Sequence, residues 1–525
     1  MLERNTIIIY TLIICLCRAP VEIEAANILA ISSLPQPAKY GVMSSILNGL
    51  NERGHQITWV IRFSKQSQLH NNIRQILIQE HEELYKEFIS FSMEDLDRSF
   101  FANLQNIFGK GVLVTSDIIN NPSVKEIMKH EQFDLIIFET FMTEALYGLG
   151  EYFNAPMVGI SSFGTSTSLD KLVGNVSPTS FIPTLFIQHI FEVTFLHRFL
   201  NVALSLVDKM TYDLLYLPHQ RKLYEEFFPN ATVNFDQANR NFSLVLLNQH
   251  HSMLFPRPYL PNMIEVAGLH IDERLEQLPL NVQQFLDDAP FGVIYFHLAA
   301  GLKTFKLNLN STSILFQTFK NLNYKIICNM DNMSPQAEKY RNILQVYNVS
   351  HHSILAHPHV KLFVTNGELL SIIDSVYYGK PILGLPMFTH QHFNINMAIQ
   401  MGYGLGLKFK QLHESKLQHL LLELLNNPSY SIKVKELSAV FRDQPLKPKE
   451  RALYWIEYVL RHKGAVHLRS KGRFLNIWQF NNIDVLLAYL VIFVVIVFGI
   501  WITMKCMYFL LFRHKENLQI KVKRN

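Results

Sequence analysis

The chain has 525 residues, of which 49% are hydrophobic and 17% are charged, and its mean hydropathy is +0.10. This length and composition exclude a small or disordered protein and suit two domains of about 150 residues or more, with room for membrane segments. The formal net charge is +5. Because the surplus is concentrated in residues 505–525, the sequence carries no nucleic-acid-binding footprint.

The N-terminus has the pattern of a secretory signal. Arg4 precedes an apolar core at residues 6–17, and the small residues Ala25 and Ala26 follow. This core is too short to span a bilayer comfortably, so we expect residues 1–25 to be a cleaved signal peptide. A retained signal anchor is the alternative.

Alternating strands and helices predict two successive α/β halves. The first half opens with a strand, a helix and a second strand, and the residues Arg53, Gly54 and His55 form the turn before that second strand. The expected strands are residues 27–33, 56–63, 133–138, 155–161, 242–248, 292–298, 324–328, 360–365 and 381–385, with helices at residues 42–51, 143–153 and 186–217. We expect the boundary near residues 275–290, where the sequence turns polar, and residues 441–470 to pack back across both halves.

The C-terminus predicts a membrane anchor. Residues 485–504 carry no charge and have the length needed to cross the hydrocarbon core as a helix. The positive-inside bias places the tail in the cytosol and the body in the lumen. The tail bases are Lys505, Arg513, Lys515, Lys521, Lys523 and Arg524, against the single acid Glu516.

Cysteines and sequons are compatible with a lumenal body but do not prove it. Cys328 is the sole cysteine between the predicted signal and the anchor, so the mature body has no internal disulfide. Sequons for N-glycosylation stand at Asn175, Asn230, Asn241, Asn310, Asn332 and Asn348.

Residues 355–407 have the pattern of a nucleotide cradle. An apolar strand at residues 362–365 leads into Asn366 and Gly367, a turn that needs permissive backbone angles. A helix follows at residues 368–378 and is ended by Gly379. A helix that opens directly after such a loop presents free N–H groups and a positive dipole, which suit a pyrophosphate.

This stretch resembles the C-terminal signature of the membrane-bound UDP-glycosyltransferases, most closely the insect branch, and the resemblance extends over nearly the whole chain. It implies an α/β fold of the GT-B type, with two Rossmann-like domains facing a cleft and a C-terminal transmembrane helix. The implied division is a signal peptide (1–25), an N-terminal acceptor-binding domain (26–280), a C-terminal UDP-sugar-binding domain (281–440), return helices and a membrane-proximal segment (441–484), the transmembrane helix (485–504) and a cytosolic basic tail (505–525).

The resemblance also implies roles for individual residues. The general-base position falls on Lys39 and its acidic partner on Glu139, which either pairs with Lys39 or acts as the base itself. The donor-binding positions fall on Asn366, Gly367, Asp374, His390, Gln391, His351 and Asn394. No cofactor is implied beyond the UDP-sugar co-substrate, and no cluster of His, Cys and carboxylates in the sequence suggests a metal.

Several of these positions depart from the family pattern. Lysine replaces the basic histidine at Lys39, and Asn348 replaces the tryptophan that would stack on uracil. Asn366 replaces the phosphate-facing histidine, and Ala299 and Ala300 replace a glycine and a serine. Glu368 replaces a glycine, so its carboxylate either opposes the diphosphate or points away as an ordinary first-turn acid.

Three functions remain open from the sequence. The first is an inverting transfer of a hexose from a UDP-sugar to small lipophilic acceptors that arrive from the membrane. The second is a catalytically impaired relative that binds a ligand or forms an oligomer, with copies of itself or with active relatives. The third is a type I membrane receptor. The last five residues resemble a dilysine retrieval signal, because Lys521 and Lys523 lie at its spacing, and this implies an endoplasmic reticulum location. A solvated basic tail attracted to anionic lipid is the alternative.

Overall fold

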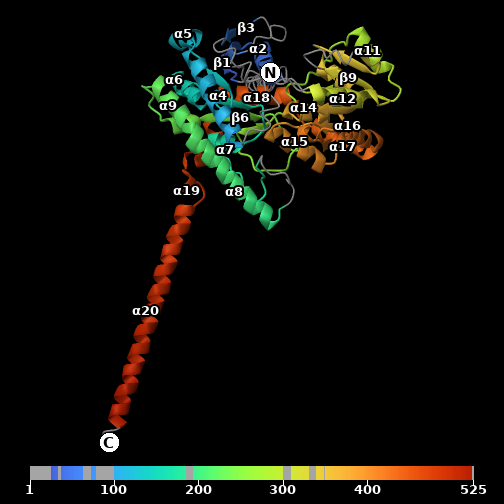
Figure 1. Cartoon of the computed structure of the whole chain (residues 1–525). Helices are drawn as coiled ribbons and strands as arrows, with labels where there is room; N and C mark the ends of the chain where they lie inside the picture. Colours follow the sequence, from blue (N-terminus) through green and yellow to red (C-terminus); the bar gives the residue numbers. More distant parts are fainter. Residues whose placement is uncertain are drawn as a thin grey trace, which may run out of the picture. The chain divides into compact units, whose positions relative to one another are not determined.

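The computed structural model describes residues 25–33, 37–62, 72–78, 100–184, 193–298, 309–329, 339–347 and 349–522. These residues form two compact units that meet between Ser470 and Lys471. The first unit, called the body below, contains two parallel β-sheets (Figure 1). The second unit is helical and is described by itself.

The first sheet of the body has seven parallel strands in the order β3-β2-β1-β4-β5-β6-β7. Its strands are β1 (Asn27–Ile31), β2 (Gln56–Ile61), β3 (Ile73–Leu77), β4 (Leu135–Glu139), β5 (Met157–Ser161), β6 (Phe242–Leu247) and β7 (Met263–Glu265). Its helices are α2 (Pro37–Glu52), α4 (Phe100–Asn120), α5 (Pro122–His130), η3 (Glu144–Gly148), α6 (Leu149–Tyr152), α7 (Thr167–Val173), α8 (Phe195–Thr211), η4 (Tyr212–Tyr216), α9 (Leu217–Phe227) and α10 (Phe235–Asn239).

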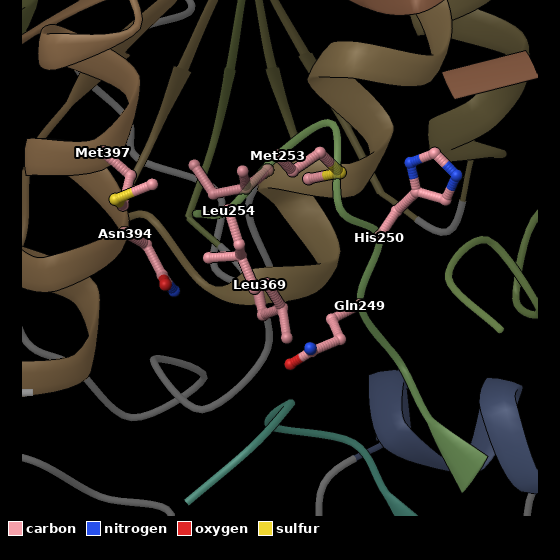
Figure 2. Close-up of a pocket in the computed structure, with 8 residues that line it drawn as sticks. Gln249, His250, Met253, Leu254, Leu369, Asn394 and Met397 are labelled. Atoms are coloured by element: carbon pink, nitrogen blue, oxygen red, sulfur yellow. The ribbon is translucent and has the colours of Figure 1, made fainter. Parts of the chain in front are cut away.

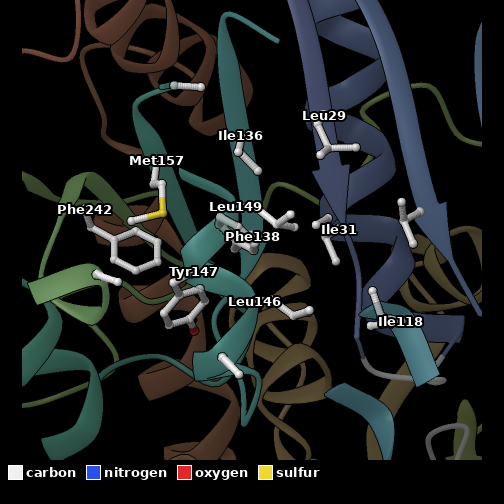
Figure 3. Close-up of a cluster of buried hydrophobic side chains, with 14 of the residues drawn as sticks. Leu29, Ile31, Ile118, Ile136, Phe138, Leu146, Tyr147, Leu149, Met157 and Phe242 are labelled. Atoms are coloured by element: carbon white, nitrogen blue, oxygen red, sulfur yellow. The ribbon is translucent and has the colours of Figure 1, made fainter. Parts of the chain in front are cut away.

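The central strands of this sheet are buried on both faces. Every residue of β4, β5 and β6 is buried, as expected for parallel strands that are covered by helices on each side. On one face, Phe138, Tyr147 and Phe242 pack edge to face with ring centroids 4.8 to 6.2 Å apart (Figure 3). This packing fixes the end of β4, which carries Glu139.

The second sheet has six parallel strands in the order β10-β9-β8-β11-β12-β13. Its strands are β8 (Val293–His297), β9 (Lys325–Asn329), β10 (Ile343–Val346), β11 (Val360–Thr365), β12 (Ile382–Gly384) and β13 (Gly404–Gly406). Its helices are α11 (Leu280–Asp287), α12 (Leu309–Lys320), α13 (His351–Ala356), α14 (Leu369–Tyr378), α15 (Thr389–Gln400), η6 (Phe409–Gln411), α16 (Glu414–Asn426) and α17 (Pro428–Arg442). Cys328 lies buried in β9 as a free thiol.

The last helix of the body, α18 (Pro448–Arg461), returns to the first half and packs on α2 and β6. The turn at residues 53–55 anchors it, because Arg53 donates to Glu457 at 2.7 Å and also pairs with Glu450. Before it, Phe441 at the end of α17 contacts the rings of His250 and Tyr377, one from each half. The short helix η7 (Val466–Leu468) closes the body.

The C-terminal unit consists of η8 (Lys471–Phe474), α19 (Ile477–Phe480) and α20 (Ile483–Val522). Helix α20 is continuous over 40 residues, and its segment Ile483–Arg513 is long and apolar enough to cross a membrane (Figure 1). The most apolar 18-residue stretch of this segment has a mean hydropathy of 3.1. The helix therefore runs past the predicted span of residues 485–504 into the basic tail, since no glycine or proline follows Gly499 to end it.

Two expected helices differ in the structure. Residues 143–153 form the 3₁₀-helix η3 followed by the single turn α6, because Gly148 and Gly150 fit against the side chains of Phe228 and Met157, which restrict the path of the chain. In the expected helix at 186–217, α8 begins at Phe195 and passes into the π-helical turn η4. Residues 186–192 of that prediction lie outside the described part of the chain.

Candidate functional site

The predicted nucleotide cradle is present as a strand, a tight turn and a helix. Strand β11 ends at Thr365, and α14 begins at Leu369. Gly367 between them has a φ of +86°, and a Cβ at this position would lie 2.7 Å from the side chain of Ile395. The turn therefore needs glycine both for its backbone conformation and for the close approach of α15. Gly379 ends the helix in the left-handed conformation, as predicted.

The carboxylate of Glu368 contacts two residues of helix α15. Glu368 is the residue before the first turn of α14, and its carboxylate accepts a hydrogen bond from Gln391 Nε2 at 2.7 Å. The same carboxylate oxygen lies 3.0 Å from His390 Nε2. His390 and Gln391 are the residues expected to hold the sugar, so an internal carboxylate occupies the groups that a donor would use.

The amide of Gln391 makes three hydrogen bonds. Its Oε1 accepts hydrogen bonds from the backbone N–H groups of Met387 and Phe388, at 2.8 and 3.1 Å, while its Nε2 donates to Glu368. Asn394, one turn further along α15, donates to the carbonyl of Gly367 at 2.9 Å. Asn366 is buried beside Thr365. These residues thus tie the cradle turn to α15.

Asp374, the residue expected to bind the ribose hydroxyls, lies buried among three histidines. Its Oδ1 is 2.9 Å from His270 Nε2 and 3.4 Å from His352 Nε2, and its Oδ2 is 3.1 Å from His351 Nε2. Burial alone would raise the pKa of Asp374, but the histidines outweigh this effect and hold the pKa well below its ordinary value. The carboxylate is therefore ionised and already hydrogen-bonded.

His351 and His352 sit at the start of α13 and respond differently to the same carboxylate. Burial lowers the pKa of His351 despite its contact with Asp374. Burial also lowers the pKa of His352, but the nearby carboxylates, Asp374 foremost, raise it above the ordinary value. His351 uses its other ring nitrogen, Nδ1, to contact the hydroxyl of Tyr295 at 2.9 Å.

Glu139 lies buried at the carboxyl end of β4, where Ser162 Oγ donates to its Oε1 at 3.3 Å. The ring of Phe163 next to Ser162 is 4.7 Å from that of Phe141 and 6.1 Å from that of His390. The first half therefore brings its buried carboxylate to the same interface to which the second half brings its expected sugar-binding pair.

Other predicted positions lie outside the described residues. The side chain of Lys39 is one, although its backbone belongs to α2, so the predicted pairing with Glu139 stays a prediction. Asn348 and residues 299–301 are others.

A small cavity lies between the two halves near α14. A cavity of about 10 Å³, no more than one water molecule needs, lies between the segment 249–254 and helices α14 and α15. Figure 2 shows Leu254 and Gln249 on the side of Leu369, whereas the ring of His250 points away from Leu369 and Met397. No described side chain in this cavity carries a carboxylate or an ammonium group.

A larger cavity of about 190 Å³ lies in the first half, beside α7, η4 and α9. It lies within residues 26–280, which the resemblance identifies as the acceptor-binding domain. Its lining is polar, because Lys171 pairs with Asp213 and Arg221 pairs with Asp236 there, and Glu144 accepts from Tyr212. Burial raises the pKa of the Glu144 carboxyl.

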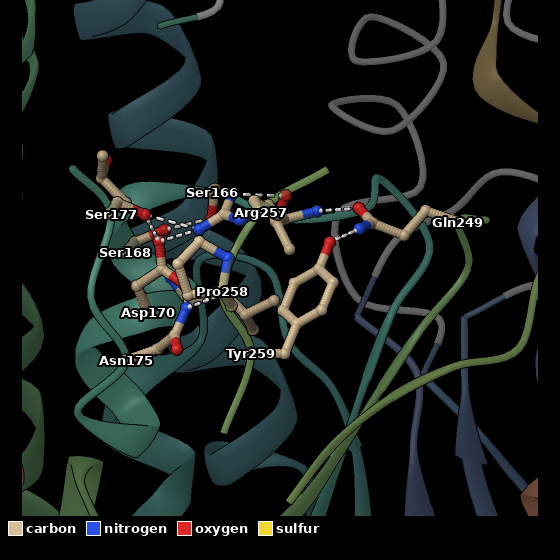
Figure 4. A network of polar contacts seen from close by, with 12 residues as sticks. Ser166, Ser168, Asp170, Asn175, Ser177, Gln249, Arg257, Pro258 and Tyr259 are labelled. Atoms are coloured by element: carbon tan, nitrogen blue, oxygen red, sulfur yellow. Dashed lines mark hydrogen bonds and ion pairs between the residues drawn. The ribbon is translucent and has the colours of Figure 1, made fainter. Parts of the chain in front are cut away.

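A buried polar network fastens the loops of the first half near the interface (Figure 4). Arg257 donates to Asp170 at 2.8 Å and to Thr165 Oγ1 at 2.8 Å. Asn175 donates to Asp170 at 2.8 Å and to the carbonyl of Pro258 at 3.2 Å. Because its side-chain amide is buried in this network, Asn175 is not accessible as a glycosylation acceptor, although it stands in a sequon.

Sequence reasoning missed His270 and His352. His270 is 104 residues away from Asp374 in the chain and follows β7 in the first half, so no local spacing connects it to α14. His352 neighbours the predicted His351, and the doublet could have indicated that a helix start presents two imidazoles to one partner.

Comparisons with known proteins identify relatives over most of the chain. The family model described as "UDP-glucoronosyl and UDP-glucosyl transferase" matches residues 32–522. UDP-glucosyltransferase 2 of Dactylopius coccus is 28% identical over 475 residues, covering 90% of this chain and 91% of its own length. UDP-glucuronosyltransferase 2B1 of Rattus norvegicus is 26% identical over 463 residues, covering 84% and 86%.

Solved structures show the same fold at low identity. The calicheamicin glycosyltransferase CalG4 superposes with a TM-score of 0.58 at 14% identity, covering 84% of this chain and 99% of its own. The glycosyltransferase VinC, solved in complex with dTDP, gives a TM-score of 0.54 at 13% identity, covering 83% and 99%. The two parallel sheets with their covering helices are therefore the two Rossmann-like domains of a GT-B fold.

Proposed function

Since the chain belongs to the family of UDP-glucuronosyl and UDP-glucosyl transferases, we propose that it transfers a hexose from a UDP-sugar to small lipophilic acceptors, with donor binding weaker than in its relatives. We infer the weaker donor binding from the contacts that the Glu368 carboxylate makes with His390 and Gln391. A donor must displace this carboxylate before either residue can hold its sugar. No cofactor beyond the UDP-sugar co-substrate is part of this proposal.

Glu139 is the proposed base for the acceptor hydroxyl. It is a buried carboxylate at the interface of the two halves, and the aromatic rings of Phe141 and Phe163 lie beside it. In an inverting transfer, the base takes the proton of the hydroxyl as that oxygen attacks the anomeric carbon, and UDP leaves from the opposite face. The backbone N–H groups at the start of α14 then stabilise the departing diphosphate.

We expect the Glu139→Gln variant to lose on the order of a hundredfold or more of the transfer rate, because an amide cannot accept the proton. Transfer of radiolabelled glucose from UDP-glucose to a panel of phenols and lipophilic alcohols measures this. The control is Ser162→Ala, which removes one hydrogen bond to Glu139 but keeps the carboxylate and should cost only a few-fold. Equal rates for Glu139→Gln and the unmodified protein would contradict the role of Glu139.

The exposed face of α8 supports a lipophilic acceptor that comes from the membrane. This helix is inverted in polarity, since Asn201 and Ser205 are buried while Phe195, Phe199 and Met210 are at least 57% exposed. Asn201 is held by hydrogen bonds to the carbonyls of Thr179 and Ile182. An apolar face of this kind is unfavourable in water and favourable against lipid.

We also propose that α20 anchors the protein in the endoplasmic reticulum membrane as a single-pass type I protein with a lumenal body. The apolar span Ile483–Arg513 and the basic residues after it support this orientation. Protease added to sealed microsomes should remove only the tail and leave the body intact. Digestion of the body would contradict the orientation, and unchanged location after Lys521→Ala with Lys523→Ala would contradict the retrieval signal.

A second candidate function is a protein without transfer activity that binds a lipophilic ligand or forms an oligomer with active relatives. The same contacts of Glu368 favour it, together with the three histidines on Asp374, because both carboxylates are already bonded within the chain. Titration with UDP separates the two candidates, since only the first requires the nucleotide to bind.

A further inference from the structure

We propose that His270, His352 and Asp374 form a binding site for a divalent transition-metal ion, with Zn²⁺ the best fit, that fastens the two halves of the body together. Each residue offers one ligand atom, a ring nitrogen or a carboxylate oxygen, and these atoms lie within 4.8 Å of one another. The ring nitrogens that contact Asp374 are Nε2 of His270 and Nε2 of His352. Among the described residues, this group has the composition of a two-histidine, one-carboxylate site.

The distances suit a small ion. Zinc binds imidazole nitrogen and carboxylate oxygen at about 2.0 to 2.2 Å, so two ligands of a tetrahedral site stand roughly 3.3 Å apart. Asp374 Oδ1 is 2.9 Å from His270 Nε2 and 3.4 Å from His352 Nε2, which brackets that separation. Both nitrogens converge on one oxygen from different elements. The three ligand atoms spread over as much as 4.8 Å, so the imidazole rings must move closer together for one ion to bind all three.

The surroundings orient the carboxylate of Asp374, whereas the buried Nδ1 of His270 has no hydrogen-bond partner among the described residues. The other oxygen of Asp374, Oδ2, is 3.1 Å from His351 Nε2, and His351 Nδ1 is held by the hydroxyl of Tyr295. Hydrogen bonds of this kind orient a ligating carboxylate. The first oxygen, Oδ1, contacts His270 and His352 in the structure, and a bound metal would replace these contacts. The side chains of Asp374 and His270 are 4% and 6% exposed, whereas that of His352 is 23% exposed, so an ion and a coordinated water reach the site from the side of His352.

The ligands come from both halves of the body. His270 follows β7 of the first sheet and lies against α2 at Gly41, while His352 and Asp374 belong to α13 and α14 of the second half. A bound ion would thus restrict movement of the halves. It would also occupy the carboxylate expected to hold the ribose, so Zn²⁺ should weaken nucleotide binding; this last step rests on the proposed function.

Titration of the full-length protein in detergent with ZnCl₂ tests the site. We expect one high-affinity Zn²⁺ per chain, no comparable binding of Mg²⁺, which avoids imidazole ligands, and a visible absorption spectrum of tetrahedral Co²⁺ when CoCl₂ is used. The His352→Gln variant, at the most exposed ligand, should lose at least about tenfold in Zn²⁺ affinity and the Co²⁺ spectrum. Thermal unfolding without metal checks that this variant is folded.

The matched control is His130→Gln. His130 is an exposed histidine 3.3 Å from a single carboxylate, Glu126, and its replacement should leave Zn²⁺ binding unchanged. Absence of one tight Zn²⁺ in the unmodified protein, or equal binding and an unchanged Co²⁺ spectrum in His352→Gln, would overturn the proposal. The Co²⁺ spectrum of the unmodified protein decides the matter even if the variant fails to fold. Titration with UDP, with and without Zn²⁺, tests the proposed UDP-sugar donor and not the Zn²⁺ site. A protein that binds Zn²⁺ but not UDP would contradict the proposed donor and leave the Zn²⁺ site supported.

Discussion

Replacing Glu368 with glycine should strengthen the binding of UDP-glucose by about tenfold to a hundredfold. In the unmodified protein, the donor must break the contacts of the Glu368 carboxylate with His390 and Gln391. Hydrogen bonds to charged groups contribute about 1.5 to 3 kcal/mol each. Removing the carboxylate also removes a negative charge from the start of α14, where the diphosphate is expected. Isothermal titration of the purified protein with UDP-glucose measures the change.

The control for this variant is Glu414→Gly. Glu414 is an exposed acid in the first turn of α16, so the substitution changes the net charge equally without touching the cradle. Its UDP-glucose affinity should equal that of the unmodified protein. Lys39→His alone should change UDP binding and sugar transfer little. Glu368→Gly combined with Lys39→His, Asn348→Trp and Asn366→His should recover UDP binding first and sugar transfer second. Unchanged affinity in Glu368→Gly would show that its contacts with His390 and Gln391 do not limit the donor.

The second large effect is on stability. Arg257→Ala should destabilise the body by about 3 to 5 kcal/mol, because it leaves the buried carboxylate of Asp170 without its charged partner. The loss should appear as a lower midpoint of thermal unfolding and as faster hydrogen exchange in α7, which carries Asp170. Hydrogen exchange is the more informative measurement, since a chain with two domains need not unfold in one step.

A matched pair of the same chemistry serves as the control. Arg221 lies 2.9 Å from Asp236, nearly the same distance as in the buried pair, but both side chains are more than 40% exposed. Arg221→Ala should therefore cost no more than about 1 kcal/mol. If the two variants lose equal stability, burial of the pair of Arg257 and Asp170 does not increase its contribution to the stability of the body.

Local pattern predicted the scaffold well, and the comparisons confirm the family and the fold. The strands are continuous apolar runs because helices cover both faces of each sheet, and Gly367 and Gly379 mark a turn and a helix end that glycine alone adopts cheaply. These signals lie within a few residues of one another in the chain, so the sequence alone contains them.

The chemistry of the site was harder to predict because its contacts are distant in sequence. Glu368 reaches a helix 22 residues further on, and the partner of Asp374 in the first half is 104 residues away. A family pattern implies a role for Glu368 and for Asp374 from their positions in the sequence. It does not show which side chains lie beside them in the fold. The polar lining of the cavity beside α7 likewise depends on charges from α9 and α10 that no local pattern connects.

Titration of the unmodified, full-length protein with UDP-glucose, beside UDP-glucosyltransferase 2 of Dactylopius coccus, tests the central claim most directly. The contacts of Glu368 with the expected sugar-binding pair predict an affinity at least about tenfold weaker in this protein, with transfer slow in proportion. Equal affinity in the two proteins, with robust transfer by this one, would contradict the account and show that the donor displaces the Glu368 carboxylate without cost.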